Sequence, residues 1–522
     1  MIDFLIKNGN VIDGSGSEAE VLNIGIDGDS ICFVGKGEVS AREVIDAEGL
    51  VVTPGFIDTH AHSEFTILAD GRAEGKLSQG VTTEINGNCG LSAAPLFGEA
   101  FERREADQNE LGIKERWSTF GDYFKILRKE GIALNFSTLC GHGNIRASVM
   151  GYKDDQPTAS EMAEMKRLLS EALKAGARGL SSGLIYPPGI YSSAEEIIGL
   201  ARVVVSECAG GVYASHMRSE GDRLTESIKE TLRIGKESGV PVHISHIKTS
   251  GERNWKKIDM VLELIEEARA TGLMVSCDRY PYIASSTDLD TVLPSWVYAG
   301  GVQEELKRLK DPVIRQKIRS VLIANGDEFW KGVYVSSTIK PRNKWMEGEN
   351  IFDIASNTGR HPADAVIDII TDEEVRAGAI FFSMCEENLG RFLSLPYAMI
   401  GSDSSVRSFS GPTCSGKPHP RGFGSFPRFI GRYVRDEKLL KLPEAIIRLT
   451  SLPAAIFGIQ RRGLVKHGFY ADLVIFDYDA ITDEATFKEP FIKAKGIAHV
   501  FINGNHSFRD GAFTGSRAGS II

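Results

Sequence analysis

Short apolar segments that end in a polar side chain recur along the middle of this chain, and stretches with helical periodicity lie between them. Eight segments have this form: 56–59, 81–85, 133–139, 179–182, 211–215, 242–245, 274–277 and 398–402. Such an alternation predicts parallel strands joined by helical crossovers. Eight repeats predict an α/β fold with a (β/α)8, TIM-like barrel, whose functional side chains lie at the carboxyl ends of the strands. A ninth candidate strand, 379–383, could take the place of the seventh.

The helical stretches begin with clear start signals. Thr158 and Glu161 form a capping-box pair before an amphipathic stretch that ends at Gly176, and Ser193 and Glu196 repeat the pair. Two further helices are expected over 224–238 and 255–270, each closing near a glycine.

The first of these strands ends in two histidines, His60 and His62. Residues two apart on a strand point to the same face. Both imidazoles can therefore reach one zinc ion, at a nitrogen–zinc distance of about 2.0–2.1 Å. Two histidines in a surface turn are the simpler alternative, and this motif alone favours a metal only modestly.

Two later strands also end in histidine. His216 and His246 occupy equivalent places in successive strand–helix units, so they are expected to converge above the barrel. His243 lies three residues before His246, and on a regular strand it faces the other way. We therefore expect His243 to be a buried, hydrogen-bonded histidine outside the metal site.

Asp403 and Cys89 complete the candidate set. Asp403 ends the last strand, where a carboxylate can bind metal or move protons; a helix N-cap is the structural alternative. Cys89 lies in a loop rich in glycine and asparagine just after the second strand. A free cysteine is usually a small buried apolar residue, but a thiolate is also a good zinc ligand. The other six cysteines fall mostly within apolar runs and are expected to pack in the core.

Both ends of the chain contain short β segments separated by turns. Because the termini of compact folds often lie close together, residues 1–53 and 461–522 are expected to form one small β domain. The barrel would then span 54–460. The strand–helix alternation fades between 286 and 362, where charged helical stretches appear, and we interpret this segment as a lid inserted over the barrel mouth.

Composition excludes several classes of partner. The 522 residues have a net charge of −10 and no basic tract, which argues against nucleic acid and anionic membranes. The first residues do not resemble a signal peptide, and no apolar run approaches the ~18 residues of a membrane helix. Seven scattered cysteines form no disulfide pattern. We expect a cytoplasmic protein with a small-molecule partner, and the oligomeric state is not predicted.

Several motifs, taken in order, give the chain a family resemblance. The histidine pair, the later His216 and His246, and Asp403 resemble the amidohydrolase superfamily. More narrowly, the chain resembles D-aminoacylases, the N-acyl-D-amino-acid deacylases, over nearly its whole length. The narrowing motifs are Asn88-Cys89-Gly90, Gly141-His142-Gly143, Gly183-Leu184-Ile185-Tyr186-Pro187-Pro188, Ser215-His216-Met217-Arg218, Ser245-His246-Ile247-Lys248, Tyr280-Pro281-Tyr282 and His419-Pro420-Arg421.

The resemblance implies a barrel with a small β-sandwich domain built from both termini. It also implies one zinc ion held tightly by Cys89, His216 and His246. A second metal position, weak or empty, would lie among His60, His62 and Asp403. The number of bound zinc ions, one or two, is therefore not predicted. The implied reaction is hydrolysis of the amide of an N-acyl-D-amino acid, with Asp403 acting as general base and then as general acid.

The α-carboxylate of such a substrate requires cationic and hydroxyl partners. Lys248 lies two residues past His246 and shares its face if the strand continues. Tyr186 and either Tyr282 or Tyr280 could donate hydrogen bonds, and Arg421 could offer a bidentate fork; ordinary solvated charge is the alternative for Lys248 and Arg421. The resemblance points to the same positions. His142 is expected to hydrogen-bond beside the metal ligands rather than bind metal.

Two other functions remain open at this point. A cyclic-amide hydrolase of the dihydroorotase or hydantoinase kind shares the histidine pair and the late aspartate. It would normally use a carboxylated lysine, and no lysine stands at a matching strand end. A non-catalytic scaffold with the same barrel would need eroded ligands, whereas all five His/Cys candidates and the aspartate are present.

Overall fold

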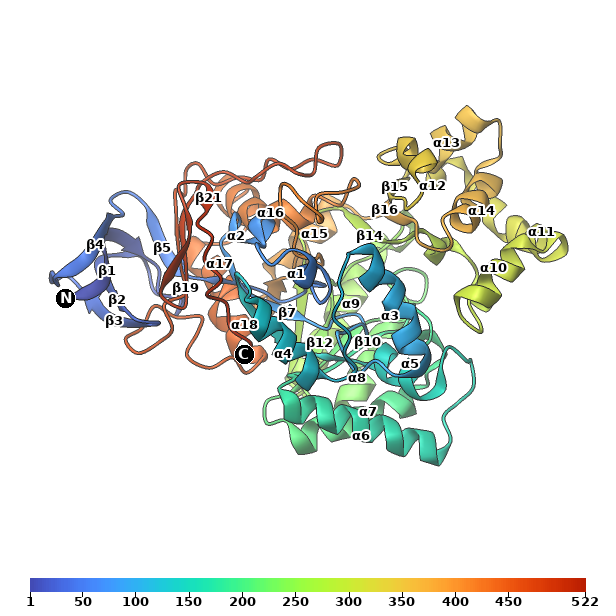
Figure 1. The fold of residues 1–522 in the computed structure, drawn as a ribbon, viewed down its shortest axis with the longest axis horizontal. Helices are drawn as coiled ribbons and strands as arrows, with labels where there is room; N and C mark the ends of the chain where they lie inside the picture. Colours follow the sequence, from blue (N-terminus) through green and yellow to red (C-terminus); the bar gives the residue numbers. More distant parts are fainter.

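The computed structural model describes residues 1–522, with a long set of parallel strands at its centre (Figure 1). Six strands pair in the order β17-β13-β12-β11-β10-β9, and three more pair in the order β6-β7-β8; every pairing is parallel. The strands are β6 (Phe56–Asp58), β7 (Val81–Asn86), β8 (Asn135–Thr138), β9 (Cys140–Gly141), β10 (Gly179–Gly183), β11 (Val212–His216), β12 (Val242–Ile244), β13 (Val275–Arg279) and β17 (Ala398–Ile400).

Backbone hydrogen bonds join the edges of these two sheets. At one edge, Thr59 N donates to Ile400 O at 3.4 Å, and Ala61 forms a parallel bridge with Ser404, which places β6 beside β17. At the other edge, Arg178 N donates to Thr138 O at 2.8 Å, which joins the stretch leading into β10 to the end of β8. Starting from β6, neighbouring strands can therefore be followed through β7, β8, β10, β11, β12 and β13 to β17, and β17 lies beside β6 again. All eight strands expected from the sequence belong to this set.

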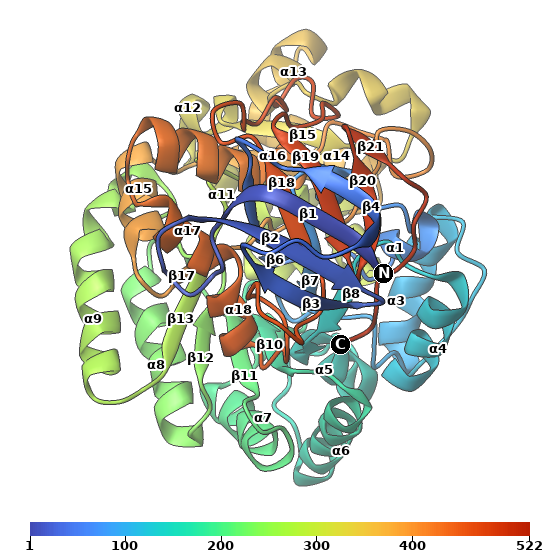
Figure 2. The same ribbon diagram turned by 90° about the vertical axis from the view of Figure 1, so that its left-hand side faces the viewer.

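Helices follow these strands and cover their outer side, as Figure 2 shows for β10 to β13. The capping box at Thr158 is confirmed: its hydroxyl accepts from Glu161 N at 3.3 Å, and the Glu161 carboxylate accepts from Thr158 N at 2.7 Å. Ser193 likewise accepts from Glu196 N at 3.3 Å. The helices are α5 (His142–Met150), α6 (Ala159–Ala175), α7 (Ala194–Glu207), α8 (Leu224–Ser238) and α9 (Ile258–Ala270).

The two ends of the chain meet in a nine-stranded sheet at the left of Figure 1. Strand β5 pairs antiparallel with β18, and this pairing joins the N-terminal strands to the C-terminal ones. Apolar residues from both ends pack in one core that includes Ile6, Val52, Leu473 and Phe501. The strands are β1 (Ile2–Val11), β2 (Glu20–Asp27), β3 (Ser30–Gly35), β4 (Ala41–Asp46), β5 (Val51–Pro54), β18 (Leu473–Phe476), β19 (Ile497–Ile502), β20 (Asn505–Arg509) and β21 (Ala512–Phe513).

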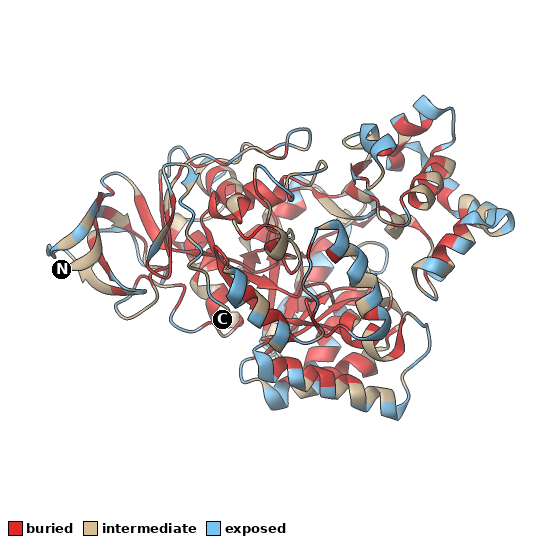
Figure 3. Ribbon diagram, in the orientation of Figure 1, coloured by how far each residue is buried: buried red, intermediate tan, exposed pale blue.

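A separate unit is inserted between β13 and β17. Strands β14 (Ala284–Asp288), β16 (Gly378–Phe382) and β15 (Val333–Ser337) pair antiparallel in that order. Its helices have buried inner and exposed outer faces (Figure 3) and surround a core that includes Trp330. They are α10 (Val302–Lys310), α11 (Pro312–Ile323), α12 (Gly326–Lys331), α13 (Ile351–Thr358) and α14 (Pro362–Asp372).

The structure corrects two expectations for this inserted unit. It extends to β16, so the predicted lid bounds of 286–362 are too narrow. The ninth candidate strand, 379–383, is β16 and does not replace the seventh parallel strand, because it pairs antiparallel with β14 and β15 in a separate three-stranded sheet. An apolar strand in an antiparallel sheet resembles a parallel one when only its local sequence is read.

The inserted unit contacts the rest of the molecule through charged groups. Arg376 pairs with Asp107 at 3.3 Å and with Glu110, both on α3 (Gly98–Glu110). Glu305 on α10 is 3% exposed, and its Oε1 atom has no hydrogen-bond partner.

No helix in the structure is both long and apolar enough to cross a membrane.

Replacing Trp330 with alanine should destabilise the inserted unit. Trp330 is 1% exposed in the core of that unit, and removing a buried Trp side chain costs about 3–5 kcal/mol. Hydrogen exchange should report faster opening of 289–379 and little change in β10 to β13. The matched control is Trp345→Ala in the same unit, because Trp345 is 47% exposed and its loss should change stability by less than about 0.5 kcal/mol. Equal effects of the two variants would contradict a separate core.

Because of Glu305, the free energy of unfolding should decrease as pH rises. Burial, followed by the nearby Asp290 charge, raises the pKa of Glu305 to about 8. The folded protein therefore keeps the Glu305 proton to about pH 8, whereas the unfolded chain releases it near the ordinary carboxyl pKa. Between these two pH values the folded state loses stability progressively as pH rises. Glu305→Gln should raise the melting temperature at pH 8.5 more than at pH 5.5. Glu304→Gln, on the exposed side of the same helix, should keep the wild-type dependence, and a flat wild-type profile would contradict this assignment.

Candidate metal centre

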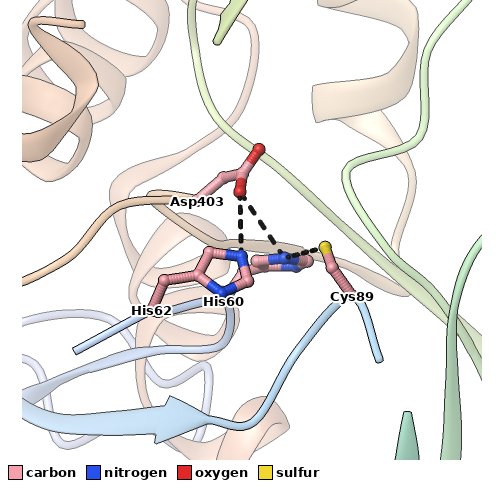
Figure 4. Close-up of side chains that lie close together, drawn as sticks. All are labelled: His60, His62, Cys89 and Asp403. Atoms are coloured by element: carbon pink, nitrogen blue, oxygen red, sulfur yellow. Dashed lines mark hydrogen bonds and ion pairs between the residues drawn. The ribbon is translucent and has the colours of Figure 1, made fainter. Parts of the chain in front are cut away.

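The side chains expected to bind metal converge at the carboxyl ends of the parallel strands. Two sets of potential ligand atoms each lie within 4.8 Å of one another. The first set is Cys89, His216 and His246, and the second is His60, His62, Cys89 and Asp403 (Figure 4). Each strand thus delivers its ligand at the same edge, as the parallel arrangement predicts.

Cys89 occupies the middle of the cluster. Its sulfur lies 3.2 Å from Nε2 of His60 and 3.4 Å from Nε2 of His246. Burial would raise the pKa of the Cys89 thiol, but the charges of His60 and His246 outweigh it and hold that pKa well below its ordinary value. The environment therefore favours the thiolate, which is the form that binds metal.

Asp403 faces the second set of ligands. Its Oδ1 lies 3.3 Å from Nε2 of His62 and 3.6 Å from Nε2 of His60, while its Oδ2 pairs with Nη1 of Arg421 at 2.8 Å. Burial opposes ionisation, but Arg421 and His62 hold the pKa of Asp403 well below its usual range. The carboxylate is therefore ionised.

The donor set fits a zinc ion. Both ring nitrogens of His216 are buried and have no hydrogen-bond partner, although such groups are nearly always paired. Burial lowers the pKa of His216, which favours the neutral, metal-binding imidazole. Despite burial, Asp403 and Cys89 raise the pKa of His62 to about 9. The local field therefore favours an added positive charge, and a thiolate with two imidazoles is a zinc ligand set.

Two carboxylates that were given no role from the sequence orient these histidines. Asp278, at the end of β13, accepts from Nδ1 of His60 at 3.0 Å and from the backbone N of His246 at 2.6 Å. Glu220 lies 2.8 Å from Nδ1 of His246. Partners of this kind set the tautomer and direct the opposite nitrogen toward a metal. The position of Asp278 at a strand end was the available signal, whereas Glu220 lies in a loop and gave none.

His243 lies where its odd spacing from His246 predicted. It is fully buried and bonds Ser276 at 2.9 Å and Asp278 at 2.7 Å. It belongs to neither set of potential ligands.

The backbone is strained at three members of the cluster. Cys89, His246 and Asp403 have φ values of +54°, +37° and +51°, in the left-handed region that non-glycine residues seldom occupy. Such conformations persist where the surrounding structure determines them and gather at functional sites.

A cavity of about 1610 Å³ opens in front of the cluster and extends beneath the inserted unit. Lys248, Tyr280, Tyr186 and Arg421 all line it. The Tyr280 hydroxyl is buried without a partner, and the Arg421 guanidinium lies 4.6 Å from its ring centroid. Burial would raise the pKa of Tyr280, but Lys248, Arg279 and Arg421 lower it overall. This wall therefore suits an anionic group.

Tyr186 lies on another wall of the same cavity. Its ring centroid is 5.1 Å from that of His216, and its hydroxyl lies 3.0 Å from the Thr287 hydroxyl on β14. It therefore contacts the inserted unit as well as the ligand cluster.

Two sequence expectations are not met. Tyr282 does not line the cavity: its hydroxyl donates to Asp483 at 3.2 Å, because the chain turns at Pro281 after β13 ends. Tyr280, the other option, faces the site. His142 binds no metal ligand, and it contacts Glu196 on α7 at 2.7 Å. The reason is that His142 begins α5 and points into helix packing instead of extending the strand.

Comparisons with known proteins show the family of the chain. A model of the amidohydrolase family matches residues 43–299 and 395–508, two stretches that leave out most of the inserted unit. A D-aminoacylase of Alcaligenes xylosoxydans xylosoxydans is 37% identical over 521 residues, which cover 100% of this chain and 97% of that protein.

Solved structures extend the likeness to three dimensions. An N-acyl-D-glutamate deacylase from Bordetella bronchiseptica, complexed with zinc and a phosphonate inhibitor that mimics the tetrahedral intermediate, has a TM-score of 0.85 at 34% identity, over 100% of this chain and 99% of that one. A D-aminoacylase studied for its binuclear metal centre, with one-metal activation and second-metal attenuation, has a TM-score of 0.84 at 36% identity, with the same coverage. The α/β fold of this chain matches both, and the chain belongs to the amidohydrolase family, within its D-aminoacylase branch.

Proposed function

We propose that this protein is a zinc-dependent amidohydrolase that cleaves N-acyl-D-amino acids, or dipeptide-like compounds with a C-terminal D-residue, and releases the D-amino acid. The observation that supports this most is the thiolate–imidazole cluster of Cys89, His216 and His246 beside an ionised Asp403. Three relatives that align with this chain over nearly its whole length are named D-aminoacylase, N-acyl-D-glutamate deacylase and N-acyl-D-aspartate deacylase.

Cys89, His216 and His246 would hold the tight zinc ion, and His60 and His62 with Asp403 would form a second, weaker position. When bound, zinc polarises the scissile carbonyl and makes water a stronger acid. Asp278 and Glu220 hold the imidazoles of His60 and His246 in the required orientation. Three protein ligands leave a coordination position open, as catalytic zinc sites require.

Asp403 would transfer the proton. It accepts a proton from the attacking water as general base and passes it to the leaving nitrogen as general acid. Arg421, 2.8 Å from the carboxylate, keeps Asp403 ionised before the reaction. Lys248, Tyr280 and Arg421 would bind the α-carboxylate of the substrate, and Tyr186, which lines the same cavity, would donate a hydrogen bond to it.

We further infer that the eight parallel strands form a (β/α)8 barrel over 54–460, and that 1–53 and 461–522 form a β-sandwich domain. The return of β17 to β6 supports the barrel, and the single core shared by both termini supports the sandwich. The inserted unit would act as a lid over the cavity. Seven free cysteines are compatible with the expected cytoplasmic location.

A cyclic-amide hydrolase is less well supported. That chemistry normally uses a carboxylated lysine, and the lysines nearest the cluster, Lys76 and Lys248, both form ion pairs. Cys89 occupies the central position instead. A non-catalytic scaffold would not retain a complete, oriented ligand set.

A substrate panel tests the function directly. Zinc-loaded protein should hydrolyse N-acetyl-D-amino acids with kcat/KM at least about 10²-fold above the matching L-compounds, and chelator should abolish turnover. Hydantoin and dihydroorotate should remain uncleaved. Activity confined to L-substrates would overturn the stereochemical assignment, and cleavage of only cyclic amides would favour the alternative.

Replacing Asp403 with asparagine should leave the tight zinc ion bound but lower kcat by about 10²–10⁴-fold, because the proton acceptor is lost. Zinc content by atomic emission and steady-state kinetics check both parts. Asp222→Asn is the control, because Asp222 lines the same cavity with a side chain that is 58% exposed. Full activity in Asp403→Asn would remove this residue from the mechanism.

A further inference from the structure

A buried lysine lies against the strands that bear the His60, His62 and Asp403 side chains. Lys76, on α2 (Glu74–Leu77), has no exposed surface. Its ammonium donates to Oδ2 of Asp58 at 2.6 Å, to the Ser402 hydroxyl at 2.8 Å and to the Ser404 carbonyl at 3.2 Å. It also pairs with Glu84 at 2.8 Å, and the carboxylates of Asp58 and Glu84 are buried completely. The proposed chemistry gives none of these groups a part.

These contacts tie the end of β6 to the segment that follows β17. Asp58 is the last residue of β6, and its Oδ1 accepts from the backbone N of Ser402 at 2.8 Å and of His60 at 3.2 Å. The Ser402 hydroxyl donates to Oδ2 of Asp58 at 2.6 Å. Lys76 therefore contacts the residues on both sides of Asp403 and the residue two before His60.

Asp403 needs such support because its backbone is left-handed, with φ at +51°. A strained conformation of this kind persists only where the neighbouring structure determines it. Asp403 N donates to the His60 carbonyl at 2.8 Å, and His62 N donates to the Ser404 carbonyl at 3.2 Å. The Ser404 carbonyl also accepts from Lys76, so the ammonium takes part in one of these hydrogen bonds, and it contacts Ser402 on the other side of the strained residue.

We propose that Lys76 is a positioning residue that holds the His60–His62 segment and Asp403 at their working separation. The inference rests on the proposed function for its catalytic consequence, and on the geometry alone for its structural one. Lys76 acts through Asp58, Ser402 and Ser404 and touches no reacting atom.

The simpler reading is that Lys76 only neutralises two buried carboxylates, since an unpaired buried charge is strongly unfavourable. Ser402 separates the two readings, because its hydroxyl belongs to the link between Lys76 and Asp58 and carries no charge. If neutralisation is the whole role, loss of the Ser402 hydroxyl should have no more effect than loss of another buried hydroxyl.

The variants are chosen to break the link without leaving an extra charge. Lys76→Met combined with Glu84→Gln removes one cation and one anion, so the buried group keeps its net charge. Ser402→Ala removes one hydroxyl of the link and no charge, and it serves if the double variant does not fold. Glu84→Gln alone is the control for the first. Ser137→Ala is the control for the second, because Ser137 on β8 is 1% exposed and its hydroxyl has no partner.

Three measurements on the full-length protein are compared. Hydrogen exchange, with and without zinc, reports the backbone amides over 400–406. Zinc titration reports how many metal equivalents bind and how tightly, and the cobalt–thiolate absorption band reports whether Cys89 still binds metal. Kinetics on an N-acetyl-D-amino acid report kcat and KM.

We expect faster exchange over 400–406 in Lys76→Met/Glu84→Gln and in Ser402→Ala, even without metal. The second zinc equivalent should bind about 10–100-fold more weakly and kcat should fall by a similar factor, with KM and the cobalt–thiolate band unchanged. Both controls should resemble the wild type.

The inference would be overturned if Ser402→Ala and a folded double variant both exchanged the amides over 400–406 at the wild-type rate and bound the second zinc equivalent as tightly as the wild type. A Glu84→Gln effect as large as that of the double variant would also overturn it. If the exchange and metal shifts appear but no variant, nor the wild type, cleaves any N-acyl-D-amino acid, then the proposed function fails and the positioning role stands.

Discussion

The contact of the Cys89 sulfur with two imidazoles is the interaction around which the strand ends are arranged. A thiolate that is removed from water needs nearby positive charge, and His60 and His246 supply it at 3.2 and 3.4 Å. Those imidazoles in turn bond to Asp278 and Glu220. Anions therefore lie on both sides of each ring, and the raised pKa of His62 indicates that the local field favours an added positive charge. A divalent cation supplies that charge directly, which is why the same side chains that stabilise one another in this arrangement also form a metal site.

The strand set and most of the ligands could be predicted from the sequence because both depend on short-range patterns. An apolar run that ends in a polar residue marks a strand and the edge at which its side chain emerges, and parallel pairing brings those edges together. The parity of His243 and His246 is the clearest case. Three residues separate them, and the structure turns His243 away from the metal ligands to bond Ser276 and Asp278.

The expectations that failed concern places where a strand stops. Tyr280 and Tyr282 would share a face on a continuous strand, but β13 ends at Arg279 and Pro281 redirects the chain, so only Tyr280 meets the cavity. His142, expected to hydrogen-bond beside the metal ligands, is the first residue of α5 and does not continue the preceding strand toward them. The lid bounds were too narrow because β16 is apolar like the parallel strands, and its antiparallel partners lie far along the chain. In each case the deciding contact is not local.

Lys248 lies beside His246, as the sequence predicted, although the strand on which that prediction was based does not continue to it. It was expected to share the face of His246 on a strand that continues, yet β12 ends at Ile244 and His246 has a left-handed backbone. Lys248 still reaches Nδ1 of His246, at 2.7 Å, because Glu220 holds both side chains. The same left-handed turn occurs at Cys89 and Asp403. Side-chain periodicity therefore finds the strand from which each ligand comes, whereas a strained turn just beyond the strand decides where the ligand points. Buried groups that hold those turns, such as Asp58 and Asp278, determine the geometry of the site as much as the ligands do.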